Sequence, residues 1–371
     1  MPPHCPWSDC REHHRTEPGY RFAHAGHYVT RTGLVPRCRC GTCGRTFGRR
    51  AFETTYYLKR AELQEPIAKG LVAGSAHRQL ARSLGCAAST VTRQSARLGR
   101  HALLFMAQAL RSLPEEPLEP FAADHYESFE FSQDFPFGVL TLVGRASWFV
   151  YGLDPVPHGR TGRITPAQRA RLLTRPRRPR RGGYAGSFAR GLDGLLRVAS
   201  KDGPIRVACD GNPAYRHAVR VHRDRDRIAL ACYPNPRRGP KGSPRSVEAR
   251  RRDKALHTVD QFHELIWHTL ASEKPETIAF GRRLNAILER LMLMVVWRNF
   301  IKGRSERRPD RSTPAMHVGL TRRPWAWAEV LARRRFFRHE NLFPVWRELY
   351  HRTWTTPMLR SNTRHALRHA F

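Results

Sequence analysis

Two short pairs of cysteines near the amino terminus constrain the local fold more than any other feature of this chain. Cys5 and Cys10 enclose four residues, and Cys40 and Cys43 enclose two. Each pair places two thiolates on a tight turn, and two such turns complete the tetrahedral shell of a Zn²⁺ ion. About thirty strand-rich residues lie between the pairs, too few to fold without a metal. We therefore predict a zinc finger over residues 1–50, with Zn²⁺ bound by Cys5, Cys10, Cys40 and Cys43.

The remaining cysteine and three histidines of this segment leave alternatives for the zinc ligands. Five of the eight cysteines lie within the first 43 residues, and this clustering favours metal binding over disulfides. Cys38 alternates with two arginines along a predicted strand, so we assign it to the core of the finger. His4, His13 and His14 are alternative ligands. The first residues lack the basic-then-apolar order of a secretory signal, so we expect an intracellular, reducing compartment, the cytoplasm.

The pattern of residues 51–112 predicts a helix-turn-helix. Leu80 and Leu84 share one face of a first helix, which Gly85 ends. Ser89 is then suited to cap a second helix, whose polar outer face is typical of a recognition helix in a major groove. An ordinary helical hairpin is the alternative. The predicted DNA-contacting residues are Ser89, Thr90, Thr92, Arg93, Gln94 and Arg97.

The charge of the chain indicates a polyanionic partner. Lys and Arg number 66 against 31 Asp and Glu, a formal net charge of +35 that is spread along the whole sequence, so we predict binding to double-stranded DNA. The strongly apolar run Leu291–Trp297 is far too short to cross a membrane, which excludes a membrane partner. Three Arg-rich stretches are predicted to be loops that order on phosphates or stay solvated: Thr174–Gly183, Arg237–Lys254 and Lys302–Arg311.

From residue 113 the pattern predicts an α/β catalytic domain that extends to residue 305. Three strand-like segments cover 121–130, 137–144 and 147–153, and a basic helical stretch follows to about residue 199. A buried strand over Ile205–Asp210, a helix from Pro213 and a strand over Ile228–Tyr233 complete the order of a ribonuclease-H-like core. Residues 306–371 are predicted to form a basic, aromatic helical tail that packs on this core.

Three acidic residues are the predicted catalytic and metal-binding groups. The first and fourth strands of such a core lie side by side, which brings Asp124 and Asp210 together. Glu276 is the predicted third acid, at the start of a long helix whose first turn contains Pro275. Two Mg²⁺ or Mn²⁺ ions held by these oxygens would support in-line phosphoryl transfer. Glu273, Glu264 and Glu127 are alternatives for the third acid.

With these motifs in place, the chain resembles bacterial insertion-sequence transposases that join an InsA-like zinc finger and a helix-turn-helix to a DDE catalytic domain. The resemblance covers most of the chain. It implies Mg²⁺-dependent cutting at element ends, strand transfer into target DNA, and Asp124, Asp210 and Glu276 as the acids. His125 is a small departure from the family pattern after the first acid. The segments that carry the resemblance are 5–7, 39–47, 124–137, 209–215, 276–280, 297–300 and 313–320.

The leading hypothesis from sequence is therefore a transposase, a DNA-recombination enzyme that acts on element ends and target DNA as a homo-oligomer assembled on DNA. A non-enzymatic DNA-binding regulator derived from a decayed or co-opted transposase is the alternative. A nuclease with the same core but no joining step is a third, weaker hypothesis.

Overall fold

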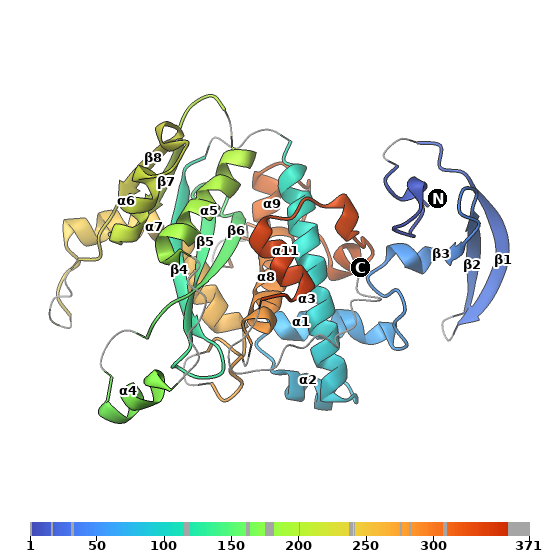
Figure 1. The fold of residues 1–371 in the computed structure, drawn as a ribbon, viewed down its shortest axis with the longest axis horizontal. Coiled ribbons are helices and arrows are strands. Elements are labelled where there is room, and N and C mark those ends of the chain that lie inside the picture. Colours follow the sequence, from blue (N-terminus) through green and yellow to red (C-terminus); the bar gives the residue numbers. More distant parts are fainter. Residues whose placement is uncertain are drawn as a thin grey trace.

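The computed structural model describes residues 2–15, 18–30, 33–114, 119–160, 164–174, 182–199, 201–236, 240, 242–274, 277–281, 283–306 and 310–354. The protein is a mixed α/β structure with a small sheet at its amino-terminal end and a larger one in its body (Figure 1). Long helices lie between the two sheets.

The amino-terminal sheet belongs to the predicted finger. Its strands β1 (Phe22–Thr30), β2 (Gly33–Cys40) and β3 (Thr46–Gly48) pair antiparallel in that order. The finger has a small core of its own, built from Cys5, Cys10, Tyr20, Cys40, Phe47 and Ala51. Short 3₁₀ helices η1 (Arg11–His13), η2 (Arg49–Phe52) and η3 (Ala61–Leu63) flank the strands and lead into the body.

The helices that follow the finger pack into the body instead of forming a free module. They are α1 (Gln64–Val72), α2 (His77–Ser83) and the long α3 (Ala88–Arg111). Gly99 of α3 touches α8 (Leu284–Phe300) so closely that an added Cβ would lie 2.3 Å from the Cβ of Glu289. Only glycine permits so close an approach at this point. The two helices, α3 and α8, pack against each other along much of their length.

The body is organised around a five-stranded mixed sheet with the order β6-β5-β4-β7-β8. Strands β4 (Phe121–Phe129), β5 (Pro136–Gly144) and β6 (Val150–Pro157) pair antiparallel. Strands β7 (Ile205–Cys209) and β8 (Ile228–Cys232) continue the sheet parallel to β4. The expected adjacency of the first and fourth strands of the body is thus confirmed.

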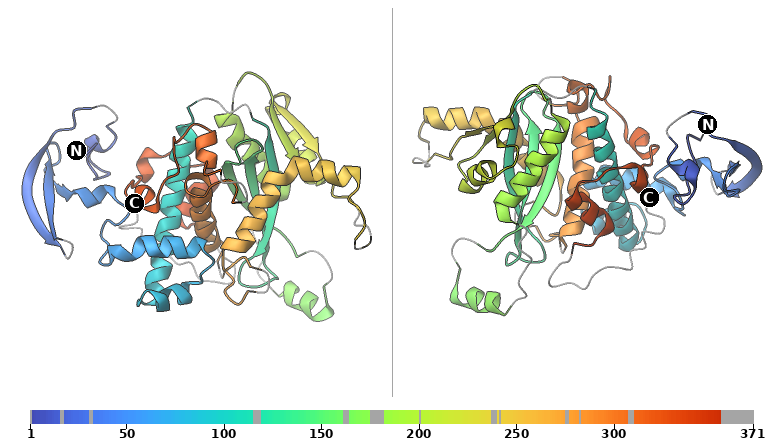
Figure 2. Two further views of the ribbon diagram at one scale, coloured as in Figure 1. Left: turned by 180° about the vertical axis from the view of Figure 1, so that it is seen from behind. Right: turned by 45° about the horizontal axis from the view of Figure 1, so that its top comes forward.

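Helices cover both faces of this sheet. An added Cβ on Gly191 of α5 (Gly183–Val198) would meet Leu140 and Leu142 of β5, so these side chains point toward α5. Between them, Thr141 points to the opposite face and lies 2.7 Å from Nε2 of His263 on α7 (Val247–Thr269). Successive residues of a strand face opposite ways, so α5 and α7 enclose the sheet, as the two views of Figure 2 show.

The other helices of the body complete one continuous hydrophobic core that runs from Leu63 to Trp354. The predicted packing is confirmed for the part of the tail that the structure describes, since Trp346, Leu349 and Tyr350 are each 3% exposed. The remaining elements are α4 (Pro166–Leu173), α6 (Pro213–Arg220), η4 (Arg225–Arg227), α9 (Pro314–His317), α10 (Trp327–Leu331), η5 (Phe337–His339) and α11 (Pro344–His351).

Two helix predictions require correction. The long helix that was expected to begin near Glu276 begins at Leu284, and residues 277–281 before it form a turn and extended chain. The stretch Arg237–Lys254 was predicted to be a loop, but α7 starts at Val247, where the Ser246 side chain caps it by accepting from the Ala249 N–H at 3.1 Å. The density of arginines in this stretch hid the apolar positions that repeat later in α7.

Candidate metal centres and nucleic-acid surface

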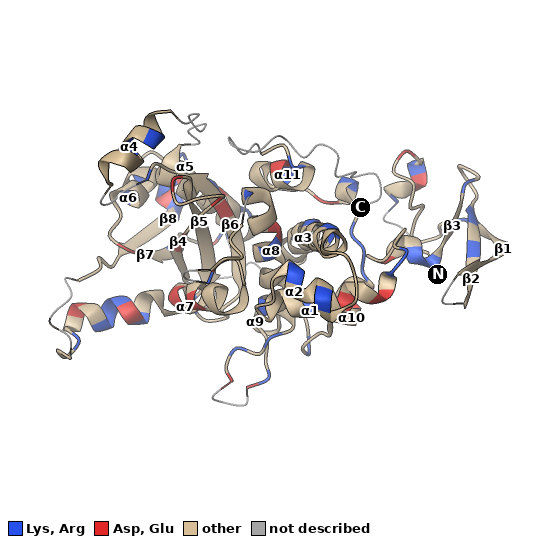
Figure 3. Ribbon diagram, turned by 90° about the horizontal axis from the view of Figure 1, so that it is seen from below, with Lys and Arg blue, Asp and Glu red and all other residues tan. Residues whose placement is uncertain are grey.

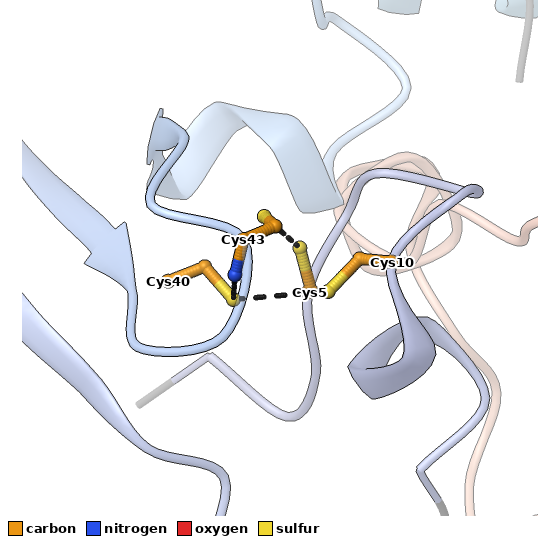
Figure 4. Close-up of side chains that lie close together, drawn as sticks. All are labelled: Cys5, Cys10, Cys40 and Cys43. Atoms are coloured by element: carbon orange, nitrogen blue, oxygen red, sulfur yellow. Dashed lines mark hydrogen bonds between the residues drawn. The ribbon is translucent and has the colours of Figure 1, made fainter.

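The two predicted pairs of cysteines come together in the finger. Their four Sγ atoms all lie within 4.8 Å of one another (Figure 4). The Sγ–Sγ distance is 3.8 Å between Cys5 and Cys43 and 3.9 Å between Cys10 and Cys40. Thiolates bound tetrahedrally to Zn²⁺ at ~2.3 Å are separated by roughly 3.8 Å. The geometry is compatible with a Cys₄ zinc site.

The local backbone explains why these cysteines meet. The amide of Cys43 donates to Sγ of Cys40 at 3.5 Å, and Gly44 takes a positive φ of 69°, which glycine adopts without strain. Burial raises the pKa of the Cys5 thiol far above its usual range, so the metal-free site retains protons that a cation has to displace. Cys38 packs against the finger core, which confirms its assignment to packing.

The two predicted aspartates of the body lie at one end of the parallel strand pair. Ala123 of β4 is paired with Cys209 of β7, and Asp124 and Asp210 each follow directly. The Asp124 carboxylate accepts from the backbone N–H of His125 at 2.8 Å, and that of Asp210 accepts from the N–H of Asn212 at 2.9 Å. The tertiary structure thereby brings together two carboxylates that are 86 positions apart in the sequence.

A third carboxylate, which the sequence analysis did not single out, acts on the same site from α7. Burial, with the charges of Asp210 and Asp260, raises the pKa of Asp124 to about 7, against the opposing effects of the His125 N–H and the charge of Arg252. Asp260 lies one turn before His263, the residue that contacts Thr141 beside Asp124. The Arg252 guanidinium also donates to the Asp260 carboxylate. Spacing on α7 could have revealed Asp260 once that helix was recognised.

The opposite side of Asp124 is lined by a buried aromatic group. The Tyr215 hydroxyl lies 3.4 Å from the Asp124 carboxylate and 2.7 Å from Nδ1 of His125. Nε2 of His125 lies 3.2 Å from the Ser187 hydroxyl on α5. Burial lowers the pKa of His125 to about 3, so its ring is neutral at pH 7. His125 and Tyr215 therefore fix the position of the first acid without adding charge.

The predicted third acid, Glu276, lies outside the described residues. Of its alternatives, Glu273 is 6% exposed and accepts from the Ser128 hydroxyl at 2.6 Å. Glu264 is exposed and accepts from Gln261 on the same helix, at 2.6 Å. Glu127 is exposed, accepts from the Tyr184 hydroxyl and pairs with His158. These three glutamates thus have other partners.

The predicted recognition helix is only partly available to a ligand. Ser89, Thr92 and Arg93 are exposed, but Gln94 and Arg97 are only 6% and 7% exposed, so their side chains offer little surface to a ligand. The Arg97 guanidinium donates to the carbonyls of Thr54 at 2.8 Å and Tyr56 at 2.5 Å.

The start of this helix also differs from the prediction. α3 begins at Ala88 after Ala87, so Ser89 lies inside the helix and does not cap it. Thr90 is half-buried. The first turns of α3 present polar side chains to solvent, whereas its middle part lies within the body and Arg111 at its end is exposed again.

The first turns of α7 form a second basic surface. Arg250, Arg251 and Lys254 are exposed there. Figure 3 shows this part of the helix projecting beyond the sheet, with basic residues repeated along it. Among the described helices, none has the length and apolar character needed to cross a bilayer.

Any functional conclusion about this protein rests on its own residues. No protein-family model matches the sequence, and no curated protein matches it significantly.

Proposed function

We propose that the protein is a DDE-type transposase of an insertion sequence, which binds element-end DNA and catalyses phosphodiester cleavage and strand transfer. The observation that carries the proposal is the position of Asp124 and Asp210 directly after a paired position of two parallel strands, with the charge of Asp260 acting on Asp124 from α7. Like-charged carboxylates kept close together are costly unless a cation binds between them. Perturbed pKa values of this kind are characteristic of functional sites.

The arrangement of the sheet supports the ribonuclease-H-like part of the proposal. Three antiparallel strands are followed by two strands parallel to the first, in the order β6-β5-β4-β7-β8. This is the order expected for such a core, with α5 and α7 on its two faces.

The donor set fits hard divalent cations. Asp124, Asp210 and Asp260 offer only carboxylate oxygens, which Mg²⁺ and Mn²⁺ prefer. Two such ions would supply activation of the attacking oxygen and stabilisation of the leaving oxygen. In the proposal Asp260 takes the role of third acid that the sequence analysis gave to Glu276. His125 and Tyr215 hold Asp124 in place, and Arg252 balances the charge of Asp260 before cations bind.

The DNA-binding part of the proposal rests on the charge of the chain and on three surfaces. These are the zinc finger, the first turns of α3 and the basic first turns of α7. The net charge of +35 favours contact with many phosphates, so salt should weaken binding steeply through counterion release. Because two element ends have to be cut and joined, we propose that a homo-oligomer assembles on DNA in the bacterial cytoplasm.

The proposal is tested by cleavage of a DNA fragment that carries one end of the element. The DNA flanking the gene identifies the substrate, since an insertion sequence is bounded by inverted repeats and a short target duplication. We expect Mg²⁺-dependent nicking that Asp210→Asn abolishes, while binding to the fragment is retained. Asp226→Asn is the matched control, because this aspartate has a side chain that is 94% exposed.

The other outcomes of this experiment would favour one of the alternative functions or overturn the site. Binding by the unsubstituted protein without nicking would favour the regulator, and nicking without joining would favour the nuclease. Nicking that persists in Asp210→Asn would overturn the assignment of the site.

A further inference from the structure

Three histidines form a second cluster beside the Cys₄ site, and two of them were alternative zinc ligands in the sequence analysis. His4 and His13 come from the finger, and His339 comes from η5, more than 300 residues later. One ring nitrogen from each lies within 4.8 Å of those of the other two. The ring centroids are 4.3 Å apart for His13 and His339 and 4.6 Å for His4 and His339.

Hydrogen bonds fix which nitrogen of each ring carries a proton. Nδ1 of His4 and Nδ1 of His13 lie 2.9 and 2.8 Å from the same acceptor, the carbonyl oxygen of Cys5. Nε2 of His339 lies 2.6 Å from the carbonyl oxygen of His13. Because a carbonyl only accepts, each of these nitrogens donates, and the other nitrogen of each ring keeps a lone pair. A backbone carbonyl bound in this way is the usual partner of a metal-ligating histidine.

The surroundings of the three histidines favour a bound ion over an ordinary cluster of packed histidine rings. Nε2 of His13 is buried and has no hydrogen-bond partner among the described residues. Buried polar atoms are normally satisfied, so this nitrogen requires an explanation. The centroid of the Phe336 ring lies 5.1 Å from that of His4 and 5.2 Å from that of His13, so this side of the cluster is apolar. His339 is half-buried, so solvent reaches the cluster from its side.

We propose that His4, His13 and His339 bind a second Zn²⁺ ion, distinct from the ion of the Cys₄ site. Neutral imidazole is a strong ligand of Zn²⁺ at ~2.0–2.1 Å, and three such ligands leave a fourth position for water. The ligand nitrogens have to approach to roughly 3.4 Å of one another, which side-chain rotation supplies.

This site would join the finger to the body of the protein. The Cys₄ site lies wholly within the finger, whereas the histidine site includes a residue of the carboxy-terminal segment. The same junction already contains a hydrogen bond from the Arg338 guanidinium to the Ser8 carbonyl, at 2.9 Å. Zinc at the three histidines therefore sets the orientation of the finger on the body.

Two substitutions remove a ligand nitrogen and keep the existing hydrogen bond. His339→Gln retains an amide N–H at the position of Nε2, and His13→Asn retains one at the position of Nδ1. His27→Ala is the matched control, because it removes an exposed histidine of the same finger.

The measurement is the number of zinc ions per full-length chain, by elemental analysis after Zn²⁺ saturation and gel filtration, and by titration of the zinc-free protein with Co²⁺. Both are done in excess Mg²⁺, which occupies the carboxylate site of Asp124 and Asp210. We expect two Zn²⁺ ions per chain in the unsubstituted protein and in His27→Ala, and one in His339→Gln and His13→Asn. The second Co²⁺ equivalent should add visible absorption without a thiolate charge-transfer band, and both ligand variants should lose that absorption.

Saturation of the unsubstituted protein at one metal ion would overturn the proposal. A second ion that survives both ligand substitutions would overturn it as well. Near-ultraviolet circular dichroism reports whether the variants keep the fold, and a variant that keeps its fold and loses only the second ion supports the site.

Discussion

Asp124 and Asp210 lie side by side at the position that follows the Ala123–Cys209 pair of β4 and β7, and the charge of Asp210 adds to burial in raising the pKa of Asp124 to about 7. The ordinary pKa of an aspartate is 3.8. The free protein therefore holds a proton at Asp124 over much of the neutral range. This proton has to leave before a divalent cation binds there, so protonation and metal binding compete.

We predict that cation binding at this site strengthens as the pH rises through about 7. Below that pH the cation has to displace a proton, and the affinity falls by up to about tenfold per pH unit for one proton released. Binding of Mn²⁺, followed by calorimetry between pH 5.5 and 8.5, measures the effect. An affinity that does not change over this range would contradict the pKa assigned to Asp124.

Asp124→Asn should stabilise the metal-free protein above neutral pH. The folded state binds more protons than the unfolded state between pH 3.8 and about 7, so the free energy of unfolding decreases as the pH rises through this window. Asparagine removes that loss. One pKa unit corresponds to about 1.4 kcal/mol, so we expect a gain of up to about 4 kcal/mol at pH 8 and little change at pH 4. Thermal melts at the two pH values measure it. A melting temperature that falls at pH 8 would argue against the charge repulsion.

Asp260→Asn should abolish Mg²⁺-dependent nicking of the end fragment and leave DNA binding intact. The loss follows from removal of one of three carboxylates, and we expect a decrease in rate of at least about a thousandfold. Glu264→Gln is the control on the same helix, because this residue is exposed and accepts a hydrogen bond from Gln261 of that helix. Equal nicking by Asp260→Asn and the unsubstituted protein would exclude Asp260 as the third acid.

Cys40→Ser should remove the zinc of the Cys₄ site and unfold the finger. The finger core is small and contains three of the four ligands, so metal binding supplies much of its folding free energy. Cys38→Ser should retain that zinc, since Cys38 is outside the four-cysteine group. Zinc release measured with a chromophoric chelator, together with protease sensitivity of residues 2–52, distinguishes the two variants. Equal zinc loss in both would show that Cys38 is a ligand.

Arg97→Ala and Arg93→Ala should separate stability from DNA binding. Loss of Arg97 leaves the carbonyls of Thr54 and Tyr56 without this donor, and we expect a destabilisation of about 2 kcal/mol. Arg93 is exposed, so its loss should change stability by less than about 0.5 kcal/mol and weaken DNA binding. Urea unfolding and fluorescence anisotropy with the end fragment measure the two effects. A stable Arg97→Ala variant would contradict the structural role.

The sequence by itself determined the features that depend on short spacing and local pattern. Cys5 and Cys10, and Cys40 and Cys43, were recognisable because each pair lies on one turn. The strands that carry Asp124 and Asp210 were recognisable because buried strands are short apolar runs, and β7 and β8 agree with the predicted segments to within one residue at the carboxyl end.

Tertiary structure decided the features that depend on what packs against a residue from elsewhere in the chain. The face of α3 that carries Gln94 and Arg97 resembles a recognition surface in sequence, but the segment that contains Thr54 covers it. Asp260 and His339 reach their sites through contacts between segments far apart in the chain. Periodicity reports which side of a helix is polar, whereas the surface that covers that side is formed only when the whole chain folds.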